Sequence, residues 1–264
     1  MRAQTLGSAF RRGVFGVLAA CALAGAAAFS SATPARAATL MVVGDVNAAP
    51  AANLPLYLNL LGSSRDVLFS RAKTSVGSIW LEYQKQSGVT VTQSAAPLTA
   101  ALLATTDMLV IAPTFDTAMD YTAAELAAVK NFVFGGGKIL MVAEAQASAV
   151  LANYNAVLQS LGTTIRYTGS RYPDIEKVPA PKPSAYSTGL GPFSLAKYDT
   201  LSGGRTIIQA SRGPAVVYEK LGGIAPIPLP AGLPLAGTGL LALGWFARRR
   251  RRSGDFDGGP GQGR

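Results

Sequence analysis

Three carboxylates and one amide are the residues of this 264-residue chain best placed for chemistry, because each follows a short apolar run that reads as a buried strand. They are Asp45, Asn47, Asp116 and Glu144. Parallel strands end at one edge of their sheet, so we expect these side chains to gather there. Two carboxylates in such a place could act as general acid and base, or could bind a hard cation such as calcium. Asx side chains at strand ends are also common turn formers and helix caps.

Other catalytic chemistries are excluded by composition. The chain has no histidine, and its one cysteine, Cys21, lies in the predicted leader. A His-based triad, a Cys–His dyad and a zinc or copper site built on His or Cys are therefore ruled out. Carboxylate-centred or hydroxyl-centred chemistry remains open. We predict no catalytic residue, no cofactor and no metal.

A glycine run, Gly135-Gly-Gly-Lys138, superficially looks like a phosphate-binding loop. A phosphate loop follows a strand and opens a helix, so that the N–H groups of the helix face the anion. Here the run follows a helical pattern and precedes an apolar strand. We therefore predict a helix end and a tight turn.

Several aromatic residues occur late in the chain. They could stack on the sugar rings of an extracellular polysaccharide, or they could cover the edge of the sheet. They are Tyr167, Tyr172, Tyr186, Phe193, Tyr198 and Tyr218.

Apolar runs alternate with segments of helical periodicity, which predicts a mainly parallel sheet covered on both faces. Strands or short apolar runs are expected over residues 39–46, 65–69, 89–92, 107–113, 138–143 and 164–167. Helices are expected over 54–61 (with Asn53 as cap), 76–86, 98–103, 122–134 (with a Thr122/Glu125 capping box) and 147–161. The fold class is α/β, a flavodoxin-like three-layer sandwich. Residues 168–226 are rich in Pro, Gly, Ser and Tyr, and we expect antiparallel edge strands at 206–209 and 215–218.

Residues 39–169 resemble the class I glutamine amidotransferase-like fold. The resemblance depends on Gly44-Asp45 after the first strand, on the strand Asp107–Pro113, and on the stretch Phe132–Val142. In active members, the strand after the glycine turn leads into a sharp elbow that bears the catalytic cysteine. The corresponding residues here are Val142-Ala-Glu-Ala145, so no catalytic residue of the family can be transferred. The resemblance implies the fold, as an amidotransferase-like domain over residues 38–221, without glutaminase activity.

The N-terminus has the features of a secretory signal peptide over residues 1–37. Arginines precede an apolar stretch at 13–29, and Ala35-Arg-Ala37 forms a small-x-small cleavage site. We expect cleavage after Ala37. A lipoprotein box ending at Cys21 is an alternative, and Arg11-Arg12 matches a twin-arginine signal poorly.

The C-terminus contains an expected membrane anchor. A proline-rich linker over residues 222–230 precedes residues 231–247, which carry no charge. As a helix these 17 residues would be roughly 25 Å long, near the lower limit for crossing a bilayer. Five arginines follow, and such a cluster stays in the cytoplasm, so residues 248–264 would form a basic cytoplasmic tail. The arginines are Arg248, Arg249, Arg250, Arg251 and Arg252. A buried core helix with a solvated run of charge is the alternative.

The linker and anchor also resemble a sorting signal. The motif residues are Ile227, Pro228, Leu229, Pro230 and Ala231. Together with the apolar segment and the arginines, they resemble the VPLPA-type sorting signals. These signals are related to the PEP-CTERM signals that exosortases recognise. The first position differs, with Ile227 in place of Val. The resemblance implies cleavage near the motif by an exosortase-like membrane protease.

Charge argues against a nucleic-acid partner. Residues 38–226 contain 14 Lys/Arg and 12 Asp/Glu, a difference of +2, although the whole chain carries +10. The basic excess therefore lies in the terminal segments and indicates topology.

Two functional hypotheses follow. The first is an exported protein that the Sec machinery and signal peptidase handle. It would be anchored in the inner membrane with its body in the periplasm. Processing would then release it to the cell surface or the medium. Its body would be a non-catalytic binding or structural module of the extracellular matrix, with polysaccharide as a candidate partner. The second is a carboxylate-based hydrolase of a glycan or small ester that uses Asp45, Glu144 or Asp116.

Overall fold

The computed structural model describes residues 38–70 and 76–222 of the protein, which form a mixed α/β domain. In chain order the elements are β1 (Ala38–Val43), the 3-10 helix η1 (Ala51–Asn53), α2 (Leu54–Leu61), β2 (Asp66–Ser70), α3 (Gly77–Gln84), β3 (Thr90–Ser94), α4 (Ala100–Leu103), β4 (Met108–Ile111), α5 (Ala123–Phe134), β5 (Lys138–Val142), α6 (Ser148–Ser160), β6 (Arg166–Tyr172), β7 (Glu176–Val178), β8 (Phe193–Leu195), β9 (Tyr198–Ser202), β10 (Arg205–Ala210) and β11 (Gly213–Leu221).

The central sheet has seven strands in the order β10-β11-β1-β5-β4-β2-β3. The five strands from β1 to β3 in this order are parallel, as predicted. β11 and β10 extend the sheet beside β1 by antiparallel pairing. The sheet is therefore mainly parallel, with antiparallel strands at one side.

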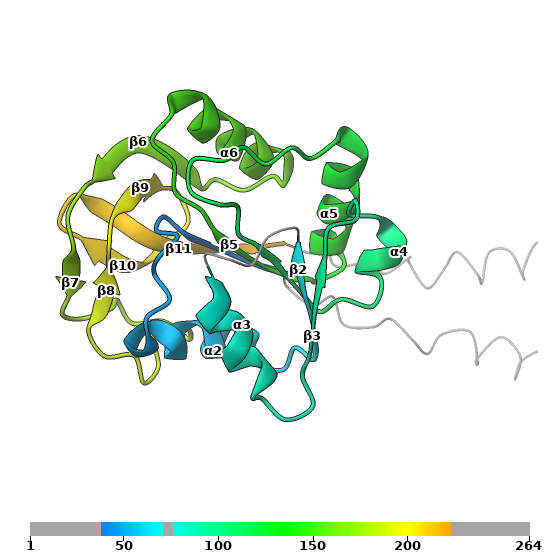
Figure 1. Ribbon diagram of the computed structural model, residues 1–264, viewed down its shortest axis with the longest axis horizontal. Coiled ribbons are helices and arrows are strands. Elements are labelled where there is room, and N and C mark those ends of the chain that lie inside the picture. The colour runs from blue at the N-terminus through cyan, green and yellow to red at the C-terminus, as the bar shows by residue number, and fades with distance from the viewer. Residues whose placement is uncertain (1–37, 71–75, 223–264) are drawn as a thin grey trace, which may run out of the picture. The chain divides into compact units, whose positions relative to one another are not determined.

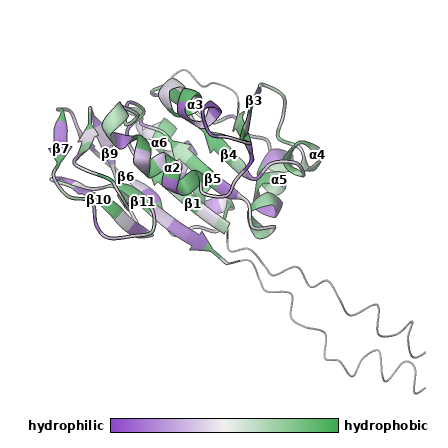
Figure 2. Ribbon diagram, turned by 90° about the horizontal axis from the view of Figure 1, so that it is seen from below, coloured by the Kyte–Doolittle hydropathy of each residue, from purple (hydrophilic) through white to green (hydrophobic). Residues whose placement is uncertain are grey.

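Helices lie on both faces of the sheet. Figure 1 shows α4, α5 and α6 on one side and α2 and α3 on the other. Alternate residues of β1 serve the two faces, because Met41 and Val43 pack in the core under α2 and α3, whereas Leu40 and Val42 pack under α5 and α6. A strand buried on both sides needs apolar residues at every position, which explains the unbroken apolar runs. Strands outside the doubly covered part of the sheet are more polar. In Figure 2, β7 and the C-terminal part of β11 are coloured hydrophilic.

The helix ends follow the sequence signals in one case and depart from them in another. At α5, Thr122 and Glu125 form the predicted capping box, in which Glu125 N donates to Thr122 Oγ1 (3.2 Å) and Thr122 N donates to Glu125 Oε2 (2.9 Å). At α2, Asn53 is at the predicted cap position, but its side chain makes no capping hydrogen bond. Its buried amide instead donates to Ala48 O (3.2 Å) and Ser194 O (2.7 Å), tying two loops together.

The late part of the chain contains more strands than predicted. β11 is not an edge strand, because it lies between β1 and β10 and pairs with all six residues of β1. β6 leaves the central sheet and pairs with β9, while β7 and β8 form a separate two-stranded sheet. These strands are short and largely polar, and their pairing partners are distant in sequence, so local pattern gave little sign of them.

The first and last described strands bring the two ends of the domain together. Ala38 pairs with Leu221 in the antiparallel β1–β11 ladder, so both ends lie at the edge where the parallel strands begin. Within residues 38–70 and 76–222, no helix has the length and apolar character needed to cross a membrane. The predicted signal peptide (1–37), membrane helix (231–247) and basic tail (248–264) lie outside the described residues, as does all but Gly222 of the predicted linker.

Candidate functional site at the carboxyl edge of the sheet

The candidate site lies where the chain leaves two neighbouring parallel strands in opposite directions. β1 and β5 are paired, but β1 leads to α2 on one face of the sheet and β5 leads to α6 on the other. The loops after these strands diverge, and an opening remains between them at the carboxyl edge. In open α/β sheets this switch point is the usual place for a ligand.

Asp45 follows β1 and is completely buried. Its Oδ1 accepts a hydrogen bond from Asn47 N (2.7 Å), and its Oδ2 accepts one from Ala196 N (2.8 Å). Burial raises the pKa of Asp45 from 3.8 to about 7, against the lowering effect of these two bonds. Both oxygens are engaged by backbone groups, so this carboxyl holds the loop after β1 against the segment between β8 and β9.

Glu144 follows β5, and its side chain is 1% exposed. Its Oε1 accepts from the Arg171 guanidinium, through Nε at 3.1 Å and through Nη2. Its Oε2 is buried without a hydrogen-bond partner among the described residues. A buried carboxylate oxygen without a donor is rare in proteins and costs free energy unless something fills its place.

Arg171 comes from β6, and its side chain remains 22% exposed. Its guanidinium lies over the Phe115 ring, 5.1 Å from the ring centroid. The residue therefore reaches from the surface to the buried Glu144 and partly neutralises it.

Asp199, on β9, is a third buried carboxyl at this edge, and it is not among the site residues predicted from the sequence. Its Oδ2 accepts from Ala145 N (2.7 Å), whereas Oδ1 has no partner in the part of the chain that the structure describes. Burial raises its pKa to about 6, and the nearby Glu144 charge adds to this effect. Asp199 lies within a short, mostly polar strand whose pairing is not visible in sequence, so no local signal marked it.

Gly44 explains how Asp199 comes so close. Asp199 N donates to Gly44 O (2.7 Å), and Gly44 N donates to Ala215 O (2.9 Å). A Cβ at Gly44 would lie 2.1 Å from Asp199 O, which no side chain can tolerate. The glycine after β1 thus allows β9 to pack against the strand end.

Asp116 has a structural role. It is the one non-glycine residue with positive φ (56°) among the described residues. Its Oδ1 accepts from Gln146 N and Ala147 N, both at 2.8 Å, and its own N–H donates to Glu144 O (3.1 Å). Asp116 therefore fixes the loop that carries Glu144.

Glu144 and Arg171 border a hollow of about 450 Å³. It is lined by Val46, Asn47, Thr114, Phe115, Glu144, Arg171 and Lys197. Of the four predicted site residues, Asn47 and Glu144 line it, while Asp45 and Asp116 support its walls. Within the described ranges, no group of three or more His, Cys, Asp or Glu side chains is arranged to hold a metal ion.

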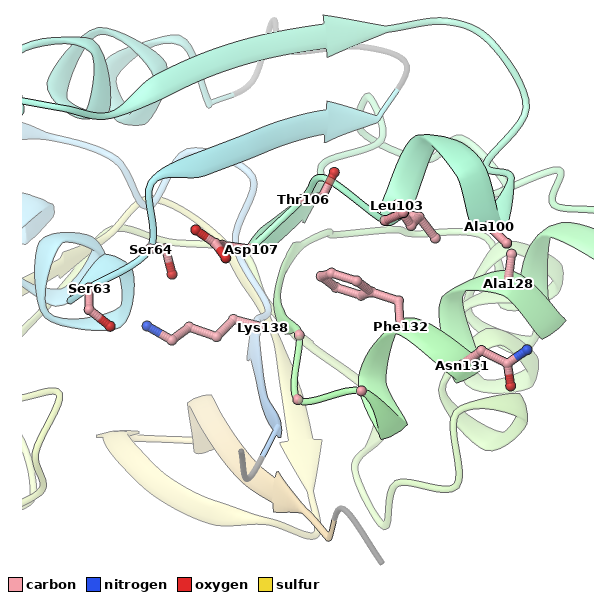
Figure 3. A pocket seen from close by; sticks show the side chains of 14 residues that line it. Ser63, Ser64, Ala100, Leu103, Thr106, Asp107, Ala128, Asn131, Phe132 and Lys138 are labelled. Carbon is pink, nitrogen blue, oxygen red and sulfur yellow. The ribbon is translucent and has the colours of Figure 1, made fainter. Parts of the chain in front are cut away.

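A second hollow, of about 580 Å³, lies at the opposite edge of the sheet and includes the glycine run. Figure 3 shows the Lys138 side chain extended toward Ser63 and Ser64. The Phe132 ring lies against Gly137, where an added Cβ would be 2.3 Å from Phe132 Cζ. Lys138 Nζ donates to Leu60 O (3.1 Å) and Leu61 O (2.8 Å), the last carbonyls of α2. α5 ends at Phe134 and β5 begins at Lys138, so the predicted helix end and turn are confirmed.

Most late aromatic residues are buried, which favours the covering role. Tyr167, Phe193, Tyr198 and Tyr218 are at most 7% exposed. Tyr172 and Tyr186 are partly buried against the core on the α2 and α3 side.

Comparison with known families gives a match in the later part of the chain. The family described as Domain of unknown function (DUF4350) matches residues 77–232, which is more than half of the chain. The protein belongs to the DUF4350 family. The matched range includes Asp116, Glu144, Arg171 and Asp199, whereas β1 and Asp45 precede it. Neither the curated proteins nor the solved structures yield a match.

Proposed function

We propose that this DUF4350 protein is exported and C-terminally anchored, is processed by an exosortase-like protease, and carries a non-catalytic binding module. The binding site of the module is the hollow beside Glu144. The observation on which the proposal depends is the buried Glu144 Oε2, which has no partner among the described residues and belongs to a residue that lines the hollow. A ligand with an O–H or N–H group would satisfy it.

The flavodoxin-like, class I amidotransferase-like identity of the fold is part of the same proposal. The parallel sheet with helices on both faces supports it. By the proposed resemblance, Val142-Ala-Glu-Ala145 corresponds to the elbow in which active amidotransferases hold their cysteine. The elbow residues Ala143, Glu144 and Ala145 lack the positive φ that a strained nucleophile elbow would have, which supports binding without catalysis.

The domain geometry is compatible with a C-terminal anchor. Both described ends leave from the edge where β1 begins, while the hollow beside Glu144 lies where β1 and β5 end. A tether at the first edge would leave the hollow unobstructed. The proposed localisation is based on the export signals and the Ile227–Ala231 motif, not on the structure of the domain.

A hydrolase remains the second candidate because Asp45 and Glu144 lie near each other and burial raises the pKa of Asp45 to about 7. Carboxyls with different environments can divide acid and base roles. However, both Asp45 oxygens accept backbone hydrogen bonds, and Asp45 does not line the hollow. The geometry therefore favours binding.

Two experiments test the proposal. Intact mass spectrometry of the protein from native membranes and medium should give a C-terminus near Ala231, and a mature chain that keeps the arginines would contradict processing. For the module, the full-length protein in detergent is applied to a panel of neutral, acidic and amino-sugar oligosaccharides, with retention and reducing-end release both measured. We expect retention without release, lost in Glu144→Gln and kept in Glu82→Gln, which alters a carboxylate on α3. Released product, or equal retention by both variants, would contradict the proposal.

A further inference from the structure

The charges around the hollow specify a ligand class, and this inference depends on the binding module proposed above. Glu144 and Arg171 form an ion pair and largely cancel. Lys197 is exposed and has no partner among the residues that the structure describes. The lining therefore has one surplus positive charge, contributed by Lys197.

The deeper carboxyls change this balance only partly. The charge of Glu144 interacts with Asp45, which follows β1, and with Asp199 on β9, while Asp116 binds the loop after β5. Burial raises the pKa values of Asp45 and Asp199 to about 7 and about 6, so near neutral pH they hold protons more readily than surface carboxyls do. None of the three lines the hollow, whereas Arg171 and Lys197 do.

We infer that the hollow binds a hydroxylated carboxylate, of the kind presented by a uronic acid residue in an acidic polysaccharide. A hydroxyl of the sugar donates to Glu144 Oε2, and the sugar carboxylate binds Lys197, with Asn47 and Thr114 as further polar groups in the lining. An ammonium ligand would suit Glu144 but would lie between two cations. A neutral sugar would leave Lys197 without a partner.

The shape of the hollow agrees with this class. A volume of about 450 Å³ lies within the usual range for small-molecule sites. Phe115 is 40% exposed and provides an apolar surface at the rim, next to Arg171. Sugar rings commonly combine such an apolar contact with charged hydrogen bonds.

Calorimetric titration of the full-length protein in detergent tests the inference with three probes of equal length. These are a trimer of galacturonate, a neutral trimer of glucose and a trimer of glucosamine. We expect binding of the galacturonate trimer, weakened by added salt, and at least tenfold weaker binding of the other two. Free galacturonate tests whether one residue suffices or the polymer is required.

Matched variants assign the contacts. Lys197→Gln should weaken galacturonate binding about three- to tenfold, and Glu144→Gln at least tenfold. Lys220→Gln alters an exposed lysine near the C-terminal end of β11. This control should leave the affinity for galacturonate unchanged. Because Lys197 is exposed, its variant is expected to fold normally.

The outcomes separate the two proposals. If glucose or glucosamine trimers bind as tightly as galacturonate and Glu144→Gln still abolishes binding, the ligand class is wrong and the binding module stands. An unchanged affinity in Lys197→Gln also overturns the ligand class. If no probe binds, or Glu144→Gln binds as the parent does, the module itself is refuted.

Discussion

Replacing Arg171 by Met should expose the cost of the buried Glu144 charge. Arg171 supplies both donors to Glu144 Oε1, and Oε2 already lacks a partner among the described residues. Without Arg171, the Glu144 carboxylate, whose side chain is 1% exposed, has no opposite charge to pair with. Breaking one side of a buried ion pair typically costs about 3–5 kcal/mol. Because Arg171 is 22% exposed, we expect the lower end of that range.

The assay is thermal and urea unfolding of the full-length protein, followed by circular dichroism at neutral pH. For a domain of this size, a loss of about 3 kcal/mol corresponds to a fall in Tm of about 6–12 °C. The double variant Arg171→Met with Glu144→Gln should recover part of the loss, since it removes the buried charge.

The control is Lys85→Met on α3. Lys85 Nζ lies 2.8 Å from Glu82 Oε2, but the Lys85 side chain is 68% exposed, so its loss should cost less than about 1 kcal/mol. If Arg171→Met is no more destabilising than Lys85→Met, the Glu144–Arg171 pair is not a buried, energetically coupled unit and our reasoning on the site is refuted.

Three further predictions concern the frame of the site. Gly44→Ala should destabilise the fold by about 3 kcal/mol or more, because its Cβ would lie 2.1 Å from Asp199 O; an unchanged Tm would contradict the close approach. Thr122→Ala should cost about 1 kcal/mol by removing the capping box of α5, measured by urea unfolding, and a loss below 0.3 kcal/mol, roughly the error of that method, would show that the box contributes little. Burial raises the pKa of Asp45 to about 7, so the folded state holds a proton that the unfolded state loses near pH 4. The free energy of unfolding should therefore fall as the pH rises from 4 to 7, and Asp45 should contribute at most about 4 kcal/mol of this fall. Asp45→Asn should make the free energy of unfolding depend less on pH over the same range.

Much of the parallel part of the fold was predictable because its signals are local. Strands buried on both faces must be apolar at every position, and the helix from Ala123 to Phe134 carries its capping box within four residues. The edge at which Asp45, Asn47, Asp116 and Glu144 gather followed from the same logic, since parallel strands end together.

The rest of the site depends on contacts between distant segments. Arg171 and Asp199 reach Glu144 only because β6 pairs with β9 and because Gly44 admits β9 beside the end of β1. The segment from Tyr198 to Ser202 is short and mostly polar, so its burial reflects tertiary packing rather than pattern. Asn53 shows the same limit, since its side chain binds a loop 141 residues away instead of capping its helix.

Hydrogen-exchange mass spectrometry, with and without saturating galacturonate trimer, tests the central claim most directly. We predict slower exchange in the loops after β1 and β5, at residues 44–47 and 143–147, and at the Lys197–Asp199 segment. Protection confined to the opposite edge, around Ser63, Asn131 and Lys138, or no protection at all, would contradict it.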